Sequence, residues 1–255
     1  MVDAGNHNAA LHGRCALITG GGRGIGRACA HALADAGAKV HVVDLDATAA
    51  KQVAEEVDGF AHVVNLADPA AIEGLPADVD VLVNNAGIQH VAPVHEFPPE
   101  MFTLIQQVML TAPFLLARHC LPHMYARHWG RIINISSVHG LRASAYKSAY
   151  VAAKHGLEGL SKVIALEGAP HGVTSNCVNP GYVRTALVEN QIAEQAATHG
   201  IAAEEVVERV LLHRSAIKRL IEPEEVAALV TWLCGEQSSY ISGASLPVDG
   251  AWTAS

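Results

Sequence analysis

Residues 15–26 have the sequence CALITGGGRGIG, in which an apolar run leads into a glycine-rich turn and then into an alanine-rich stretch. The run is typical of a buried strand, and the alanines predict a helix that begins near Gly24. Glycines allow a tight turn and a close approach of the backbone to a pyrophosphate, while a helix N-terminus offers free N–H groups. The alternative is a glycine-rich loop without a ligand, but the strand–turn–helix context favours a dinucleotide site.

The alternation of strand-like and helix-like stretches continues from near residue 14 to the end of the chain. This pattern predicts an α/β protein with a doubly wound, parallel, seven-stranded Rossmann-type sheet and helices on both faces, as a single domain over residues 1–255. Two prolines between Asn65 and Val79 restrict that crossover to a brief helix. The expected strands are Cys15–Thr19, Val40–Asp44, Ala61–Asn65, Val79–Val83, Arg131–Ile135, Thr174–Asn179 and Ala244–Val248.

The segment after the sixth expected strand is irregular. Helices are expected over Ala186–Ala197 and Ala203–His213. An insertion at the carboxyl end of a strand lies over the ligand crevice of a doubly wound sheet. Residues 184–220 are therefore predicted to form a helical substrate lid.

Asp44 ends the second expected strand, where a carboxylate can accept hydrogen bonds from ribose hydroxyls and repel a 2′-phosphate. Arg23 favours the opposite choice, because a basic residue in the glycine-rich turn could meet that phosphate. We give the Asp44 carboxylate more weight than Arg23, so the predicted cofactor is NAD rather than NADP. The alternative is that Asp44 only caps its strand and binds no cofactor. Asn84-Asn85-Ala86-Gly87 ends the fourth strand with small and polar residues that fit beside the adenosine half of the cofactor.

Ser137, Tyr150 and Lys154 predict redox chemistry on a hydroxyl or carbonyl group. A phenol has an ordinary pKa of about 10, so a Tyr that takes a hydroxyl proton needs a nearby cation. Tyr150 and Lys154 stand four residues apart within Ala149–Leu166, which is expected to be helical, so they project from one face. Ser137 can hydrogen-bond the same substrate oxygen.

Composition narrows the class of protein. The chain has 255 residues, half of them hydrophobic and 16% charged, but no apolar run of the ~18 to 20 residues that cross a bilayer. Residues 1–13 are polar and are interpreted as a loose tail, which makes the cytoplasm the expected location. The net charge is −8, and the sequence has no basic stripe that could bind nucleic acid.

The cysteines and histidines do not predict a metal site. The five cysteines lack CxxC spacing. No metal is expected at His119, His123 and His128, because Pro122 interrupts them and no further ligand completes a set.

Together these motifs resemble the short-chain dehydrogenase/reductase family from Gly13 to Asp249. The resemblance implies that Tyr150 is the general acid/base, that Lys154 lowers its pKa and holds the nicotinamide ribose, and that Ser137 positions the substrate oxygen. It also implies a homotetramer. The cofactor residues so implied are Gly20, Gly22, Arg23, Gly24, Ile25, Gly26, Asp44, Asn65, Leu66, Asn85, Ala86, Gly87, Tyr150, Lys154, Pro180, Gly181, Val183 and Thr185.

Met109 stands where the family usually has an Asn, which marks a helix distortion and whose backbone carbonyl holds a water leading to the Lys. A carbonyl does not depend on its side chain. Pro113, four residues on, lacks the N–H that would normally bond the carbonyl of Met109. We therefore expect Met109 to serve the catalytic site through its carbonyl, with the water relay intact.

A narrower resemblance, carried by residues 84–90, 137–141, 147–150, 183–192 and 250–254, reaches bacterial D-3-hydroxybutyrate dehydrogenases. It implies that Gln89, His139, Lys147 and Gln191 grip a substrate carboxylate and that Trp252 encloses it. Tyr182 stands where those enzymes generally have Trp. Charge-assisted hydrogen bonds from Lys suit a small hydroxy acid. The expected reaction is reversible NAD-dependent oxidation of (R)-3-hydroxybutyrate to acetoacetate, faster above neutral pH.

Each residue of this group also has a plainer interpretation, as a solvated Lys or a polar residue at a loop start. Two other functions remain open: a reductase of the same family acting on 3-oxoacyl or polyol substrates, and a protein that binds NAD with little turnover.

Overall fold

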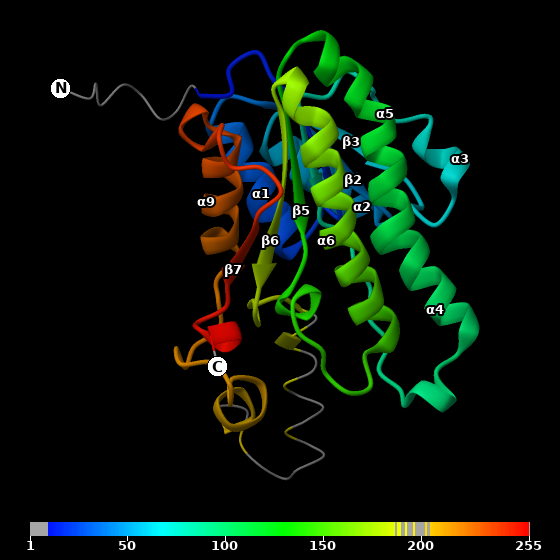
Figure 1. Cartoon of the computed structure of the whole chain (residues 1–255), viewed down its shortest axis with the longest axis vertical. Coiled ribbons are helices and arrows are strands. Elements are labelled where there is room, and N and C mark those ends of the chain that lie inside the picture. The colour runs from blue at the N-terminus through cyan, green and yellow to red at the C-terminus, as the bar shows by residue number, and fades with distance from the viewer. Residues whose placement is uncertain are drawn as a thin grey trace, which may run out of the picture.

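In the computed structural model, the described residues are 10–186, 188, 189, 192, 196, 202 and 205–254. They contain one parallel sheet with strand order β3-β2-β1-β4-β5-β6-β7 (Figure 1). The predicted doubly wound, seven-stranded fold is confirmed. The strands are β1 (Cys15–Thr19), β2 (Lys39–Asp44), β3 (Phe60–Val63), β4 (Val81–Asn84), β5 (Gly130–Ile135), β6 (Val173–Pro180) and β7 (Ser245–Val248).

Every expected strand is present, with ends that differ by up to two residues. Asn65 was expected inside the third strand, but it follows β3, because its side-chain oxygen accepts a hydrogen bond from the Ala67 N–H at 3.0 Å and turns the chain. The short helix expected in the next crossover is α3, which has only four residues, Pro69–Ile72.

Helices cover both faces of the sheet. Neighbouring residues of β1 show why: Ile18 packs into one apolar cluster with α1 and α9, whereas Leu17 packs into another with α5 and α6. Figure 1 shows α9 and α1 on one side of the strands and α5 and α6 on the other. The remaining helices are α1 (Gly24–Asp35), α2 (Ala47–Glu56), α4 (Pro99–Gln106), α5 (Ala112–Ala126), α6 (Ser148–Gly168) and α9 (Pro223–Cys234).

The described residues of the predicted lid segment lie beyond the carboxyl end of β6 (Figure 1). In the first expected helix, the described residues Ala186, Val188, Glu189, Ile192 and Ala196 are helical. The second was expected as an ordinary helix, but its described part, η6 (Val206–Leu211), is a π-helix. Val188, Ile192, Val206, Leu211, Leu212 and Leu220 form an apolar cluster of their own. The described part of the predicted lid segment therefore has an apolar cluster separate from those of the sheet.

Residues Pro99–Ala126, from α4 through α5, make a helix long and apolar enough to cross a membrane by length and composition, with a mean hydropathy of 1.3. No run of this kind was expected. The core helix of a soluble protein meets the same criteria, and here Leu116, Ala117, Cys120 and Met124 pack against the sheet. The helix is therefore weak evidence for a membrane protein.

Candidate active site

One cavity of about 650 Å³ opens at the carboxyl ends of the strands, and it gathers most of the predicted site residues. Ser137, Met109 and Lys147 line it together with Tyr150 and Lys154. The predicted residues that also line it are Gly20, Arg23, Gly24, Ile25, Asp44, Asn65, Leu66, Asn85, Ala86, Gly87, Gln89, His139, Pro180, Gly181, Tyr182, Val183 and Thr185. Gly22, Gly26 and Trp252 do not line the cavity, and Gln191 lies outside the described residues.

The glycine-rich turn is shaped for a cofactor backbone. Gly20 and Gly24 have φ of +60° and +51°, and a Cβ on Gly26 would come within 2.1 Å of the Gly20 carbonyl oxygen. The Thr19 hydroxyl oxygen accepts hydrogen bonds from the Asn85 and Ala86 N–H groups at 3.0 and 3.1 Å, which ties β1 to the end of β4. A turn that excludes side chains and begins α1 at Gly24 fits a pyrophosphate at a helix N-terminus.

Asp44 lies where a ribose-binding acid was expected, at the end of β2. Its two carboxylate oxygens accept hydrogen bonds from the Gly22 N–H at 2.9 Å and the Asp46 N–H at 3.0 Å. Arg23 makes an ion pair with Asp46. Asp46 is also the N-cap of α2, and the Ala49 and Thr48 N–H groups, together with Arg23, lower the pKa of its carboxyl. The basic residue of the turn therefore has an acidic partner, which the sequence analysis missed.

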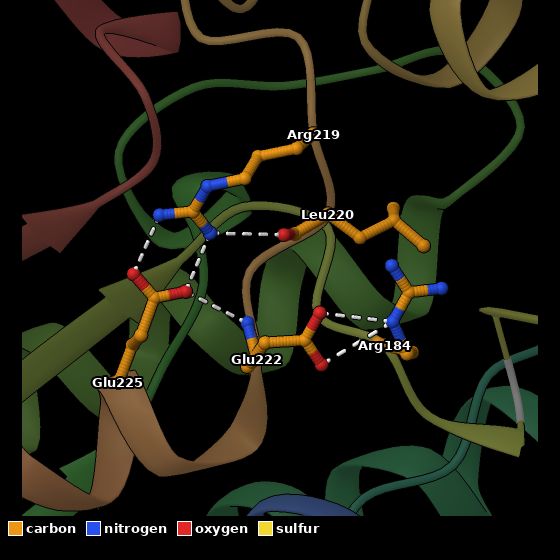
Figure 2. A network of polar contacts seen from close by, with 5 residues as sticks. All are labelled: Arg184, Arg219, Leu220, Glu222 and Glu225. Carbon is orange, nitrogen blue, oxygen red and sulfur yellow. Dashed lines mark hydrogen bonds and ion pairs between the residues drawn. The ribbon is translucent and has the colours of Figure 1, made fainter.

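The two ends of the lid segment are tied together beside the cofactor end of the cavity. Val183 forms a parallel bridge with Ile221. Figure 2 shows Arg184 Nε donating to both carboxylate oxygens of Glu222, at 3.0 and 3.2 Å.

The same network continues into α9. Arg219 pairs with Glu225 through both guanidinium nitrogens, at 2.6 and 2.8 Å, and donates to the Leu220 carbonyl (Figure 2). Glu225 also accepts from the Glu222 N–H in the capping box of α9. Val183 and Thr185, which the family resemblance assigns to the cofactor site, therefore lie beside an anchored part of the chain.

Tyr150 and Lys154 lie on α6, and Ser137 precedes a short turn, η4 (Val138–Gly140). Lys154 Nζ lies 5.7 Å from the Tyr150 ring centroid and donates to the Ile135 carbonyl at 2.6 Å. Burial lowers the pKa of Lys154 to about 8. The pKa of Tyr150 was expected below its ordinary value; instead, burial raises it, and hydrogen bonding by Ser137 only partly opposes this.

Met109 lies in a π-helical turn, η3 (Gln107–Thr111), between α4 and α5. The Ala112 N–H reaches back to the Gln107 carbonyl, and Pro113 follows without an N–H. The expected helix distortion is therefore present. The Met109 side chain is buried with Ile105, Ala149 and Ala153, and its Cε lies 3.7 Å from where a Cβ on Gly87 would be.

The other end of the cavity contains the predicted carboxylate group. Burial lowers the pKa of Lys147, whose Nζ lies 5.8 Å from the Tyr182 ring centroid. His139 has a pKa lowered to about 4, first by burial and then by the charge of Lys147. His139 Nε2 lies 2.8 Å from Ser144 Oγ, and Ser137 Oγ accepts from the His139 N–H at 3.1 Å. A neutral His beside a Lys can hold an anion.

Trp252 lies behind this group. Its ring centroid is 5.8 Å from that of His139, and the Arg214 guanidinium lies 4.8 Å from the ring on the lid side. Sequence analysis missed Ser144 and Arg214. Nothing in a single sequence pairs a loop hydroxyl with His139 or a lid arginine with the C-terminal Trp.

Metal ligation has no support among residues 10–186 and the described residues beyond them, where no three His, Cys, Asp or Glu side chains are placed to hold an ion. His119 Nε2 lies 2.9 Å from the Leu75 carbonyl oxygen, and His123 lies 3.6 Å from Asp80. These histidines make structural contacts.

The family model described as enoyl-(acyl carrier protein) reductase matches residues 20–253. The chain belongs to the short-chain dehydrogenase/reductase family. It is 44% identical to a D-beta-hydroxybutyrate dehydrogenase from Rhizobium meliloti, over 94% of this chain and 99% of that protein. It is 43% identical to a protein of the same name from Cupriavidus necator, over 96% of this chain and 99% of that protein.

Other members of the short-chain dehydrogenase/reductase family are similar at lower identity. A 3-oxoacyl-[acyl-carrier-protein] reductase from Aquifex aeolicus is 35% identical, with 94% of this chain and 97% of that protein covered. The crystal structure of a putative 2-deoxy-D-gluconate 3-dehydrogenase from Agrobacterium tumefaciens, with bound NADP, has a TM-score of 0.85 and 32% identity, with 98% and 100% covered. The chain is therefore a dehydrogenase of this family that uses a nicotinamide cofactor.

Proposed function

We propose that this enzyme reversibly oxidises (R)-3-hydroxybutyrate to acetoacetate with NAD. The observation that carries the proposal is the pairing of Lys147 with a neutral, buried His139 in the cavity that also contains Tyr150. A small hydroxy acid has one carboxylate as its main binding group, and the half-buried ammonium of Lys147 can bind it by charge-assisted hydrogen bonds. The names of the relatives at 43–44% identity support the same substrate.

Two features favour NAD over NADP. The Asp44 carboxylate stands beside the glycine-rich turn, where it can accept hydrogen bonds from ribose hydroxyls and repel a phosphate. Arg23, the basic residue that could bind the 2′-phosphate of NADP, makes an ion pair with Asp46. The similar structure with bound NADP is 32% identical, and its cofactor leaves this choice open for the present chain.

The proposed chemistry uses the side chains of Ser137, Tyr150 and Lys154. Ser137 donates a hydrogen bond to the substrate hydroxyl oxygen, and Tyr150 as phenolate takes the hydroxyl proton. As the O–H electron pair forms the new C=O bond, the hydrogen on the same carbon leaves with its pair as hydride. Bound NAD⁺ supplies the acceptor for that hydride. In the reverse direction Tyr150 returns the proton.

Because burial raises the pKa of Tyr150 in the free protein, the phenolate needs positive charge beside it. Lys154 supplies part of this positive charge, since its Nζ lies 5.7 Å from the Tyr150 ring centroid. Oxidation should therefore become faster above neutral pH, as the phenolate forms. We also propose that the enzyme is a homotetramer and works in the cytoplasm, a reducing compartment that suits its five free cysteines.

The test is NADH formation with D- and L-3-hydroxybutyrate, and with NADP in place of NAD, by wild type and by Lys147→Ala. We expect turnover of the D enantiomer with NAD, and a Michaelis constant for substrate that rises sharply in the variant. Lys162→Ala, which removes an exposed lysine of α6, is the matched control and should behave as wild type. Turnover of a 3-oxoacyl or polyol substrate, with none of the hydroxy acid, would contradict the proposal.

A further inference from the structure

Glu158 is a buried carboxylate on α6, one turn beyond Lys154, and only 5% of it is exposed. Its Oε1 accepts a hydrogen bond from Asn179 Nδ2 at 2.6 Å, and its Oε2 accepts one from Ser245 Oγ at 2.6 Å. Asn179 lies on β6 and Ser245 on β7. The one carboxylate therefore joins the helix that carries Tyr150 to the two strands beside it.

The link extends to the Ser137 turn. Asn179 Nδ2 donates a second hydrogen bond, of 3.0 Å, to the Ser137 carbonyl. Gly140 closes the same turn, and a Cβ on it would lie 2.9 Å from Glu158 Oε1 and 2.5 Å from Ser136 Oγ. No room is left for the carboxylate to move toward η4. The Ser137 turn and α6 are thus held against each other through Glu158.

Burying a carboxylate is costly unless it is well hydrogen-bonded. The two hydrogen bonds of Glu158 come from neutral groups, and an apolar side chain at this place would avoid the cost. The titratable groups that face it are Lys154 on its own helix and Cys177 on β6. The residues of β7 and η4 beside Glu158, Ser245 and Gly140, are neutral. Its charge therefore acts on Lys154, whose ammonium it favours.

We propose that Glu158 is a positioning residue for the reaction: it fixes the Ser137 turn against α6 and places a buried negative charge one turn from the Lys154 ammonium. This inference rests on the proposed roles of Ser137, Tyr150 and Lys154, and not on the identity of the substrate.

Glu158→Gln tests the charge, because the amide has the same shape and still offers an oxygen to Asn179. Without the carboxylate the Lys154 ammonium is less favoured, so Lys154 loses its proton at lower pH. We expect kcat/KM to fall at high pH, where Lys154 loses its proton, and we expect this alkaline fall to move to lower pH by about one unit in the variant. We expect kcat to fall about tenfold, with a smaller change in the KM for substrate, as for misplaced catalytic groups.

Glu167→Gln is the matched control, since it removes an exposed carboxylate from the same helix, and it should leave the profile unchanged. Ser245→Ala removes one hydrogen bond to Glu158 and keeps the charge, so it should lower kcat without moving the alkaline limb. A folded Glu158→Gln with wild-type kcat and profile overturns the proposal. If Glu158→Gln does not fold, wild-type kcat in Ser245→Ala overturns it.

The pH dependence of NADH affinity, followed by fluorescence, separates this inference from the choice of substrate. Lys154 is expected to hold the nicotinamide ribose, so NADH affinity should fall at lower pH in Glu158→Gln than in wild type. If wild type binds NADH but does not oxidise 3-hydroxybutyrate, the proposed substrate fails while this comparison still decides the role of Glu158. Identical NADH affinity curves for both proteins contradict it.

Discussion

At the scale of single residues, the proposed role of Tyr150 as a base depends on its surroundings. The pKa of Tyr150 is raised by burial, and Lys154 directs its ammonium to the Ile135 carbonyl. The Ser137 hydrogen bond alone does not reverse the effect of burial. The free protein therefore keeps the phenol protonated, and the phenolate is expected to form when positive charge enters the cavity beside it.

Removing the phenol hydroxyl should remove turnover and leave the fold. We expect Tyr150→Phe to lower kcat by about 10² to 10⁴, the usual contribution of a general acid/base. NADH affinity, measured by fluorescence, should change little, since the ring remains. Tyr146→Phe is the control, because Tyr146 is a neighbouring tyrosine that is 58% exposed. Substantial activity in Tyr150→Phe would show that another group moves the proton.

Asp46 is expected to favour NAD over NADP by holding Arg23 in an ion pair. Asp46→Asn keeps a good N-cap for α2, because Asn caps as well as Asp, but it releases Arg23 from its ion pair. We expect NADP affinity to rise about tenfold, as one charge-assisted contact to the 2′-phosphate forms. NAD affinity should hardly change. Calorimetric titration with both cofactors measures this, with Asp68→Asn, the N-cap of α3, as the control; unchanged NADP affinity would contradict the assigned role of Arg23.

At the scale of elements, sequence patterns located the strands and the glycine-rich turn better than they located contacts. Apolar runs such as Cys15–Thr19 predict strands because those runs must be buried, and the structure contains them. The π-helical geometry of η6 is not visible in the sequence, because Val206–Leu211 has the composition of an ordinary helix. The Arg23–Asp46 pair and the Ser144–His139 contact were missed because they depend on where loops turn.

The π-turn makes a specific prediction for Met109. Its side chain is 1% exposed and packs with Ile105, Ala149 and Ala153. Met109→Asn would bury an unpaired amide, which costs about 1 to 3 kcal/mol. We expect lower stability in urea unfolding and no gain in kcat, because the π-turn already distorts the helix at Met109. Met109→Leu keeps the volume and should cost less than about 1.5 kcal/mol. A kcat that increases in Met109→Asn would show that the amide itself is needed.

At the scale of the whole molecule, histidines whose pKa values are lowered by burial make stability depend on pH. The pKa of His139 is about 4 in the folded protein, against 6.5 as its ordinary value. The unfolded chain therefore binds more protons between these values, so stability falls as pH drops from 6.5 towards 4. Burial lowers the pKa values of His41 and His62 in the same direction.

Urea unfolding across this pH range should show the loss, with His139 contributing up to about 3 kcal/mol. His139→Gln should flatten the dependence between pH 6.5 and 4. His95→Gln, at an exposed position on η2 (Val94–Glu96), should leave it as in wild type. An equally steep dependence in His139→Gln would mean that other groups carry the linkage.

The outer surface of the helical layer makes the last prediction. Phe114 on α5 is 48% exposed and Leu166 on α6 is 79% exposed, and these helices lie side by side on the same face of the sheet (Figure 1). Self-association would remove this apolar surface from water, and it would explain why the helix Pro99–Ala126 is so apolar. We expect light scattering to show a tetramer, and Phe114→Glu with Leu166→Glu to reduce the mass by disfavouring the contact. Phe60→Glu is the matched control, since Phe60 is an aromatic residue of β3 that is 49% exposed, and it should leave the mass unchanged. A wild-type protein that stays monomeric at high concentration would contradict the prediction and leave the apolar faces of α5 and α6 to another partner.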